Sequence, residues 1–155
     1  MTNISNKASA AKGFQLSEQR WIARPQSEVF EYAADFSNIE DWDPGVTSST
    51  KIGDAPVGVG TRYELEVRFG SKTMPMIYET AVYEAPNRVV LHGYGDRLDA
   101  VDEIRFSSHD NMTVVDYTAV LYFKNFFRYL GPLMRPALTK VGRDALDGLE
   151  QALER

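Results

Sequence analysis

Asp102 is the residue whose type and position could most directly do chemistry in this 155-residue chain. It shares strand parity with Ile104 and Phe106, so the alternation would direct its side chain inward with theirs. A buried carboxylate needs a partner or a raised pKa, and either would suit a general acid or base. The alternative is a twist or bulge that leaves Asp102 in solvent beside Asp99 and Glu103. On the sequence alone we favour this solvated alternative.

Three tyrosines on candidate strands add hydroxyl groups that could orient a ligand or move a proton: Tyr63, Tyr78 and Tyr117. The chain has no nucleophile elbow, phosphate loop or zinc-protease motif. No residue therefore receives a catalytic role, and Asp102 and Tyr117 stay as candidates only.

The sequence contains few residues that could form a metal or cofactor site. There is no cysteine, and the two histidines fit a structural position in a strand (His92) and a turn (His109). The face to which His92 points is ambiguous. The acidic residues between Asp96 and Glu103 lack the order of a calcium loop, and Gly58–Gly60 leads into a strand instead of a helix. We expect no metal and no cofactor.

The bulk composition excludes several classes of protein. A net charge of −5 disfavours broad binding to nucleic acid, which depends on neutralising phosphates. No stretch has the apolar length of a membrane span or of a signal peptide. We expect a cytoplasmic protein with a disordered leader at residues 1–13 and a single domain at residues 14–155.

Period-two alternation marks the strands, most clearly from Gly60 to Phe69, where apolar residues alternate with arginine and glutamate. Met74, Met76, Tyr78, Thr80 and Val82 continue one parity on the next strand. None of the connections between the strands after Trp42 contains a helix long enough for a crossover, so the sheet should be antiparallel. The seven predicted strands are Phe14–Ala23, one from Val46, Gly60–Phe69, Thr73–Glu84, Arg88–Tyr94, Ala100–Ser107 and Met112–Phe123.

Three helices are predicted. The first begins at Pro25, and a second short one follows with Ser37 and Glu40 at the spacing of a capping box. Apolar residues at steps of three and four predict a long C-terminal helix, which Pro136 should kink or delay. These residues are Phe127, Leu130, Met134, Leu138, Val141, Ala145, Leu149 and Leu153.

Four segments carry a family resemblance: ARPQSEVFEYAADFSNIEDWDPGV, PVGVGTRY, YEAPNRVVLHG and GRDALDGLEQALE. In this order they resemble the START-like (Bet v 1-like) superfamily, of the polyketide cyclase/dehydrase and lipid-transport type. The resemblance implies an α+β helix-grip fold, in which a curved seven-stranded antiparallel sheet wraps around the long C-terminal helix. It also implies an apolar cavity between sheet and helix, although members with this look serve many roles.

Strand parity and the helix pattern supply candidates for the lining of that cavity. We expect these residues to bind the ligand: Trp42, Tyr63, Val67, Phe69, Met76, Tyr78, Ile104, Phe106, Tyr117, Phe127, Leu130 and Met134. A solid core without a ligand is the alternative, because aromatic and methionine stripes are usually packing.

Three functions remain open. The leading one is a carrier or sensor of a small hydrophobic or amphipathic molecule, as a monomer or homodimer. The second is a cyclase or aromatase that uses the same cavity, and the third is a protein that binds a partner through its surface. Basic residues around Arg128 and Arg135, interleaved with aromatic residues, could touch an anionic ligand or a membrane. We favour an ordinary solvated helix face there.

Overall fold

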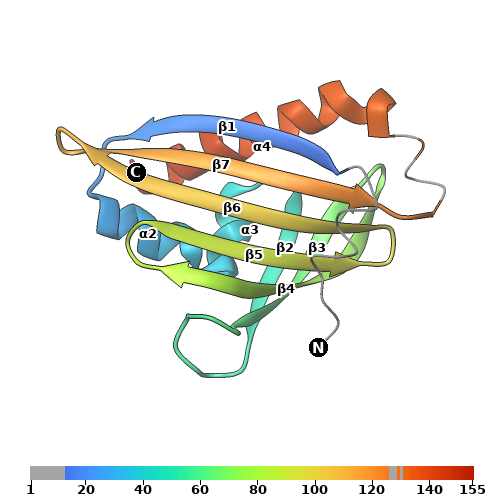
Figure 1. Cartoon of the computed structure of the whole chain (residues 1–155), viewed down its shortest axis with the longest axis horizontal. Coiled ribbons are helices and arrows are strands. Elements are labelled where there is room, and N and C mark those ends of the chain that lie inside the picture. The colour runs from blue at the N-terminus through green and yellow to red at the C-terminus, as the bar shows by residue number, and fades with distance from the viewer. Residues whose placement is uncertain (1–12, 126–128, 130) are drawn as a thin grey trace.

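The computed structural model describes residues 13–125, 129 and 131–155, with side chains for all of these except residues 131 and 132. This part of the chain forms a curved antiparallel sheet with helices on one side of it (Figure 1). The strands are β1 (Phe14–Ile22), β2 (Val46–Ile52), β3 (Arg62–Phe69), β4 (Lys72–Glu84), β5 (Arg88–Gly95), β6 (Leu98–His109) and β7 (Met112–Phe123). The helical segments are α2 (Gln26–Ala34), the 3₁₀ turn η1 (Phe36–Asn38), α3 (Ile39–Trp42) and α4 (Gly131–Leu153).

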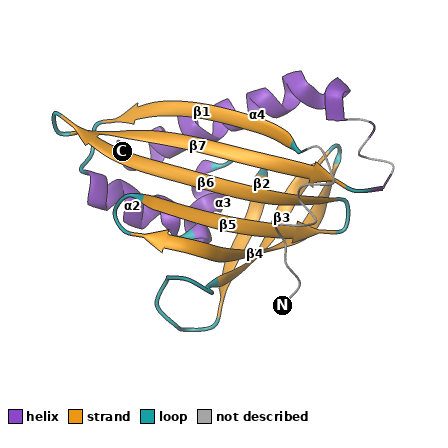
Figure 2. Ribbon diagram, viewed as in Figure 1, coloured by secondary structure: helices purple, strands orange, loops and turns teal. Residues whose placement is uncertain are grey.

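The sheet order is β1-β7-β6-β5-β4-β3-β2, and all pairs are antiparallel. Strands β2 to β7 therefore form a meander, and β1 pairs with the last strand of it. The β6–β7 hairpin turns through Asp110 and Asn111, both with positive φ, in the region that suits a tight hairpin. The predicted seven-stranded helix-grip architecture is confirmed (Figure 2).

Alternation along the strands separates a buried inner face from a wetter outer face. On β3, Tyr63 and Leu65 are buried, whereas Arg62 and Glu64 are exposed. The expected parity of β4 is wrong at one point. The β4–β5 register shifts between Thr80 and Val82, so that Tyr83 packs against the core instead of Val82.

The predicted capping box at Ser37 and Glu40 is also wrong, because Asp35 caps this turn instead. The carboxylate of Asp35 accepts hydrogen bonds from the backbone N–H of Ser37 at 3.0 Å and from its hydroxyl at 2.6 Å. Asp35 thereby fixes the bend between α2 and η1.

Helix α4 packs against β1 and α3, and Pro136 lies inside it. Gly148 makes the close contact with α3, because a Cβ there would lie 1.9 Å from the carbonyl oxygen of Trp42. Arg20 of β1 forms ion pairs with Asp147 and, at 3.6 Å, with Glu150 of the helix. The predicted leader up to residue 12 lies outside the described residues.

Candidate functional site

A cavity of about 410 Å³ lies between the inner face of the sheet and α4. It occupies the end of the sheet that carries the β3–β4 and β5–β6 turns, on the right in Figure 1. Its walls are mostly apolar, and small-molecule sites commonly have about 300–1,000 Å³. The sheet and the α3–β2 connection contribute Leu16, Asp43, Pro44, Gly45, Val46, Leu65, Leu98, Asp102, Ala119, Leu121 and Phe123, among others, and α4 contributes Met134, Ala137, Leu138, Val141 and Ala145.

Small inner-face residues help to keep this space open. Ala119 pairs across strands with Asp102, and Gly93 pairs with Tyr78. A Cβ on Gly93 would lie 2.5 Å from Cζ of Tyr78, so the tyrosine ring lies flat over the glycine. Larger side chains at Gly93 or Ala119 would occupy the cavity or push Tyr78 into it.

Six of the predicted ligand-binding residues line the cavity: Val67, Phe69, Met76, Tyr78, Tyr117 and Met134. Four others do not line it and instead fill the core under α2, η1 and α3: Trp42, Tyr63, Ile104 and Phe106. The ring of Phe106 stacks edge-on with Phe30 at 5.2 Å, and that of Tyr63 lies 6.1 Å from Phe36. Predicted residues Phe127 and Leu130 lie outside the described residues.

Asp102 points into the cavity, which corrects our preference for a solvated side chain. Only 4% of it is exposed, and strand β6 keeps its alternation through this position without a bulge. The hydroxyl of Tyr117 lies near its carboxylate and favours the ionised form, which lowers the pKa of Asp102. The side chain of Asp102 therefore lies on the inner face with Ile104 and Phe106, and the expected twist does not occur.

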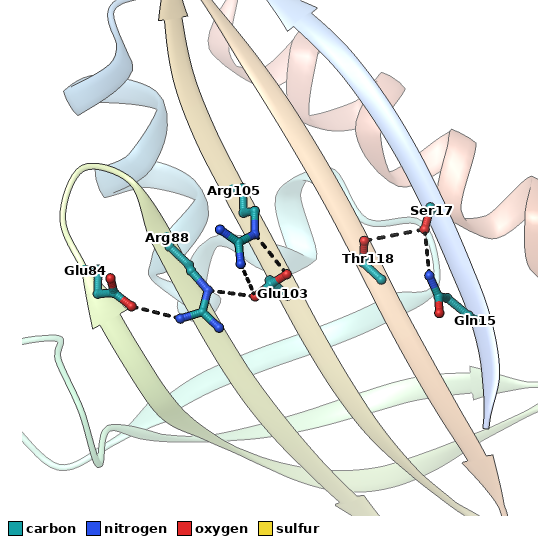
Figure 3. Close-up of polar contacts among 7 residues, drawn as sticks. All are labelled: Gln15, Ser17, Glu84, Arg88, Glu103, Arg105 and Thr118. Atoms are coloured by element: carbon teal, nitrogen blue, oxygen red, sulfur yellow. Dashed lines mark hydrogen bonds and ion pairs between the residues drawn. The ribbon is translucent and has the colours of Figure 1, made fainter. Parts of the chain in front are cut away.

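The next residue, Glu103, lies in a very different environment from Asp102. Glu103 lies on the outer face and accepts bonds from Arg88 at 2.7 Å and from Arg105 at 3.1 Å (Figure 3). Partial burial would raise the pKa of Glu103, but these two guanidinium groups outweigh it and hold the pKa below its usual range. Among the described residues, no ion pair reaches Asp102.

Asp43 is a second cavity carboxylate, which the sequence reasoning did not identify. It follows α3, and its Oδ1 accepts a hydrogen bond from the backbone N–H of Gly45 at 2.8 Å. This is the turn geometry that an Asp-Pro-Gly sequence favours, so the turn signal was visible in the sequence. Its position at the cavity wall was not, because it depends on how α3 packs against α4.

Four polar groups of the cavity form one electrostatic cluster, namely Asp43, Tyr78, Asp102 and Tyr117. Burial, reinforced by the charge of Asp43, raises the pKa of Asp102 to about 7, although the nearby Tyr117 hydroxyl opposes the rise. Burial raises the pKa of Asp43 to about 6, with the Gly45 hydrogen bond opposing and Asp144 reinforcing the rise. Burial and then the two carboxylates raise the pKa values of Tyr78 and Tyr117, which stay protonated at neutral pH.

The remaining candidates lie away from this cluster. His92 is half-buried on the outer face, and the ring of His109 lies 5.6 Å from that of Trp21. Among the described residues, no group of three or more histidine, aspartate or glutamate side chains is arranged to hold a metal ion. The described helices are each too short or too polar to cross a membrane.

A more open hollow of about 600 Å³ lies over β2 to β5. Its lining includes the charged side chains of Glu64, Glu66, Asp96 and Lys124, and it is more open to solvent than the first cavity. A ligand there would remain largely in water. We therefore place the candidate site in the smaller cavity, which has apolar walls and contains the buried cluster.

Solved structures share this fold at low sequence identity. The protein TTHA0849 from Thermus thermophilus is 20% identical with a TM-score of 0.76, over 89% of this chain and 95% of that one. The Zhui aromatase/cyclase from a Streptomyces species is 14% identical with a TM-score of 0.77, over 93% and 95%. A START superfamily protein from Mycobacterium smegmatis is 15% identical with a TM-score of 0.68, over 92% and 95%.

No curated protein matches the sequence. The family signature of polyketide cyclase/dehydrase and lipid transport proteins matches residues 14–154, which is nearly the whole chain. This match shows that the chain belongs to the polyketide cyclase/dehydrase and lipid transport family.

Proposed function

We propose that the protein binds a small, mostly apolar molecule in the cavity between the sheet and α4, and acts as a carrier or sensor of it. The observation that carries this proposal is the cavity of about 410 Å³ with apolar walls. A ligand that buries about 250 Å² of apolar surface would gain about 6 kcal/mol from the hydrophobic effect before the entropy cost of binding. Met76, Met134 and Leu138 offer adaptable walls for such a ligand.

Binding of the neutral fluorescent probe N-phenylnaphthylamine tests this proposal. We expect a saturable rise in probe fluorescence with the wild-type protein. Ala119→Leu places a larger side chain in the cavity and should weaken binding by about tenfold or more, the equivalent of about 1.4 kcal/mol. Thr118→Leu is the matched control, because Thr118 is the neighbouring residue on the outer face (Figure 3).

Two results would contradict the proposal. One is no probe binding by folded wild-type protein, together with no small molecule in native mass spectra of the protein as purified. The other is binding that Ala119→Leu and Thr118→Leu weaken equally, because the probe would then lie on the surface.

A cyclase-like enzyme is a second candidate, and one observation favours it. The pKa of Asp102 is about 7, near the value at which a carboxyl group can both give and take a proton at neutral pH. Its Tyr117 partner and the cavity walls could hold a flexible chain in a folded conformation. If a turnover assay with a linear polyketone is unaffected by Asp102→Asn, this carboxyl group performs no acid–base catalysis.

A further inference from the structure

The charged groups of the cavity wall are unbalanced. Among the described residues that line it, three are acidic, Asp43, Asp102 and Asp144, and one is basic, Arg68. Lys140 pairs with Asp144 at 2.6 Å, outside the cavity wall. Arg68 is largely exposed, and its Nε donates a hydrogen bond to the carbonyl oxygen of Pro44 at 3.0 Å. Asp43 and Asp102 are thus left without a cation among the residues that the structure describes.

Asp102 is the more deeply buried of these two carboxylates. Only 4% of the residue is exposed, its side chain faces the cavity, and the neighbouring group that favours its ionised form, the hydroxyl of Tyr117, is neutral. A carboxylate in this position loses hydration without gaining a counter-charge, which is unfavourable in a folded protein. Asp43 lies close enough for its charge to disfavour the ionised form of Asp102.

From this arrangement we infer that the ligand is an amphipathic cation: an apolar body that carries a protonated amine, with the amine placed between Asp43 and Asp102. This inference rests on the proposed function and specifies the class of its ligand. The ammonium group would donate hydrogen bonds to both carboxylates and supply their missing counter-charge. The apolar body would lie along Leu65, Met76 and Leu138, further along the same cavity.

The same arrangement disfavours an anionic ligand. The carboxylate of a fatty acid would add a negative charge beside two carboxyl groups that have no cation of their own among the described residues. An alcohol would be neutral toward the cluster and could hydrogen-bond with Asp102 or Tyr117. The charge of the head group should therefore decide the order of affinities among ligands with the same apolar chain.

Three ten-carbon probes separate these possibilities: decylamine, decanol and decanoate. Each would compete with N-phenylnaphthylamine for the intact protein at pH 7, at concentrations below micelle formation. We expect decylamine to compete at least about tenfold more tightly than decanoate, a difference of about 1.4 kcal/mol. Asp102→Asn and Asp43→Asn should each reduce this preference by a factor of three or more.

Glu103→Gln is the control variant. It removes the same charge from the adjacent residue, but on the outer face, where Glu103 bonds Arg88 and Arg105 (Figure 3). The preference for decylamine should survive in this variant. A preference that falls equally in Glu103→Gln and Asp102→Asn would reflect the net charge of the protein and would overturn the inference.

The remaining outcomes also decide the matter. If decanol or decanoate competes as tightly as decylamine, the cavity binds apolar molecules but the cation inference is wrong. If N-phenylnaphthylamine binds but decylamine does not displace it, the inference is wrong and the proposed function stands. If neither the probe nor any of the three competitors binds, both fail together.

Discussion

The burial of Asp102 makes the stability of the protein depend on pH in a way that Asp102→Asn should remove. The pKa of this carboxyl group rises from an ordinary value of 3.8 to about 7 in the folded protein. Between these values the unfolded chain has lost the proton and the folded protein still holds it. The unfolded state then binds fewer protons, so stability falls as the pH rises.

The size of the effect follows from the shift. Each unit of pKa corresponds to about 1.4 kcal/mol. A rise of about three units therefore lowers the free energy of unfolding by about 4 kcal/mol as the pH rises from below the unfolded pKa to pH 8. An asparagine at position 102 keeps nearly the same shape and cannot ionise. Relative to wild type, the variant should be more stable by about 1 kcal/mol at pH 4.5, where the unfolded chain has already lost most of this proton, and by about 4 kcal/mol at pH 8.

Urea unfolding of both proteins from pH 4.5 to 8, without ligand, measures this difference. Glu103→Gln provides a control of opposite sign, because the pKa of Glu103 is lowered in the folded protein. Its ionised form stabilises the fold above the unfolded pKa, and that stability is lost as the pH falls, so Glu103→Gln should be most costly at neutral pH. A constant difference between wild type and Asp102→Asn at all pH values would refute the reasoning.

Three further predictions concern glycines. Gly148→Ala should destabilise the protein by about 1–3 kcal/mol, because a Cβ there would lie 1.9 Å from the carbonyl oxygen of Trp42. Gly142→Ala in the same helix meets only a flexible Glu18 side chain at 3.4 Å and should be neutral or stabilising by up to about 1 kcal/mol in the same urea titration. Gly93→Ala should push the Tyr78 ring into the cavity and weaken probe binding; equal losses in the Tyr78→Ala background would contradict this contact.

The fold was largely predictable from the sequence because its two periodicities are strong. Alternation predicts the strands, and the three- and four-residue steps predict α4, which is observed from Gly131 to Leu153. The errors lie where one residue changes the local geometry. The register shift at Thr80 and Val82 exchanges the faces of β4, and Asp35 caps the turn in place of Ser37. Alternation cannot reveal a bulge before the partner strand is known.

The candidate site was predictable only in part, because parity tells which side chains point inward and not what lies above them. Tyr63 and Phe106 share the inward face with Val67 and Asp102. The first two meet aromatic rings from η1 and α2, whereas the other two face the open space below α4. Whether an inward side chain fills a core or lines a cavity is therefore decided by the helices that cover each half of the sheet.

The two carboxylates of the cavity differ in what the fold itself requires of them. Asp43 has a structural reason to be there, because its side chain closes the turn after α3 through Gly45. Asp102 has none that we can identify, since it closes no turn, pairs with no described cation and destabilises the folded protein when it ionises. An asparagine or a leucine at this position would make the folded protein more stable at neutral pH. If the cavity binds an amphipathic cation as we infer, that ligand accounts for this costly carboxyl group, and Asp102→Asn should improve stability at neutral pH while it weakens binding of decylamine.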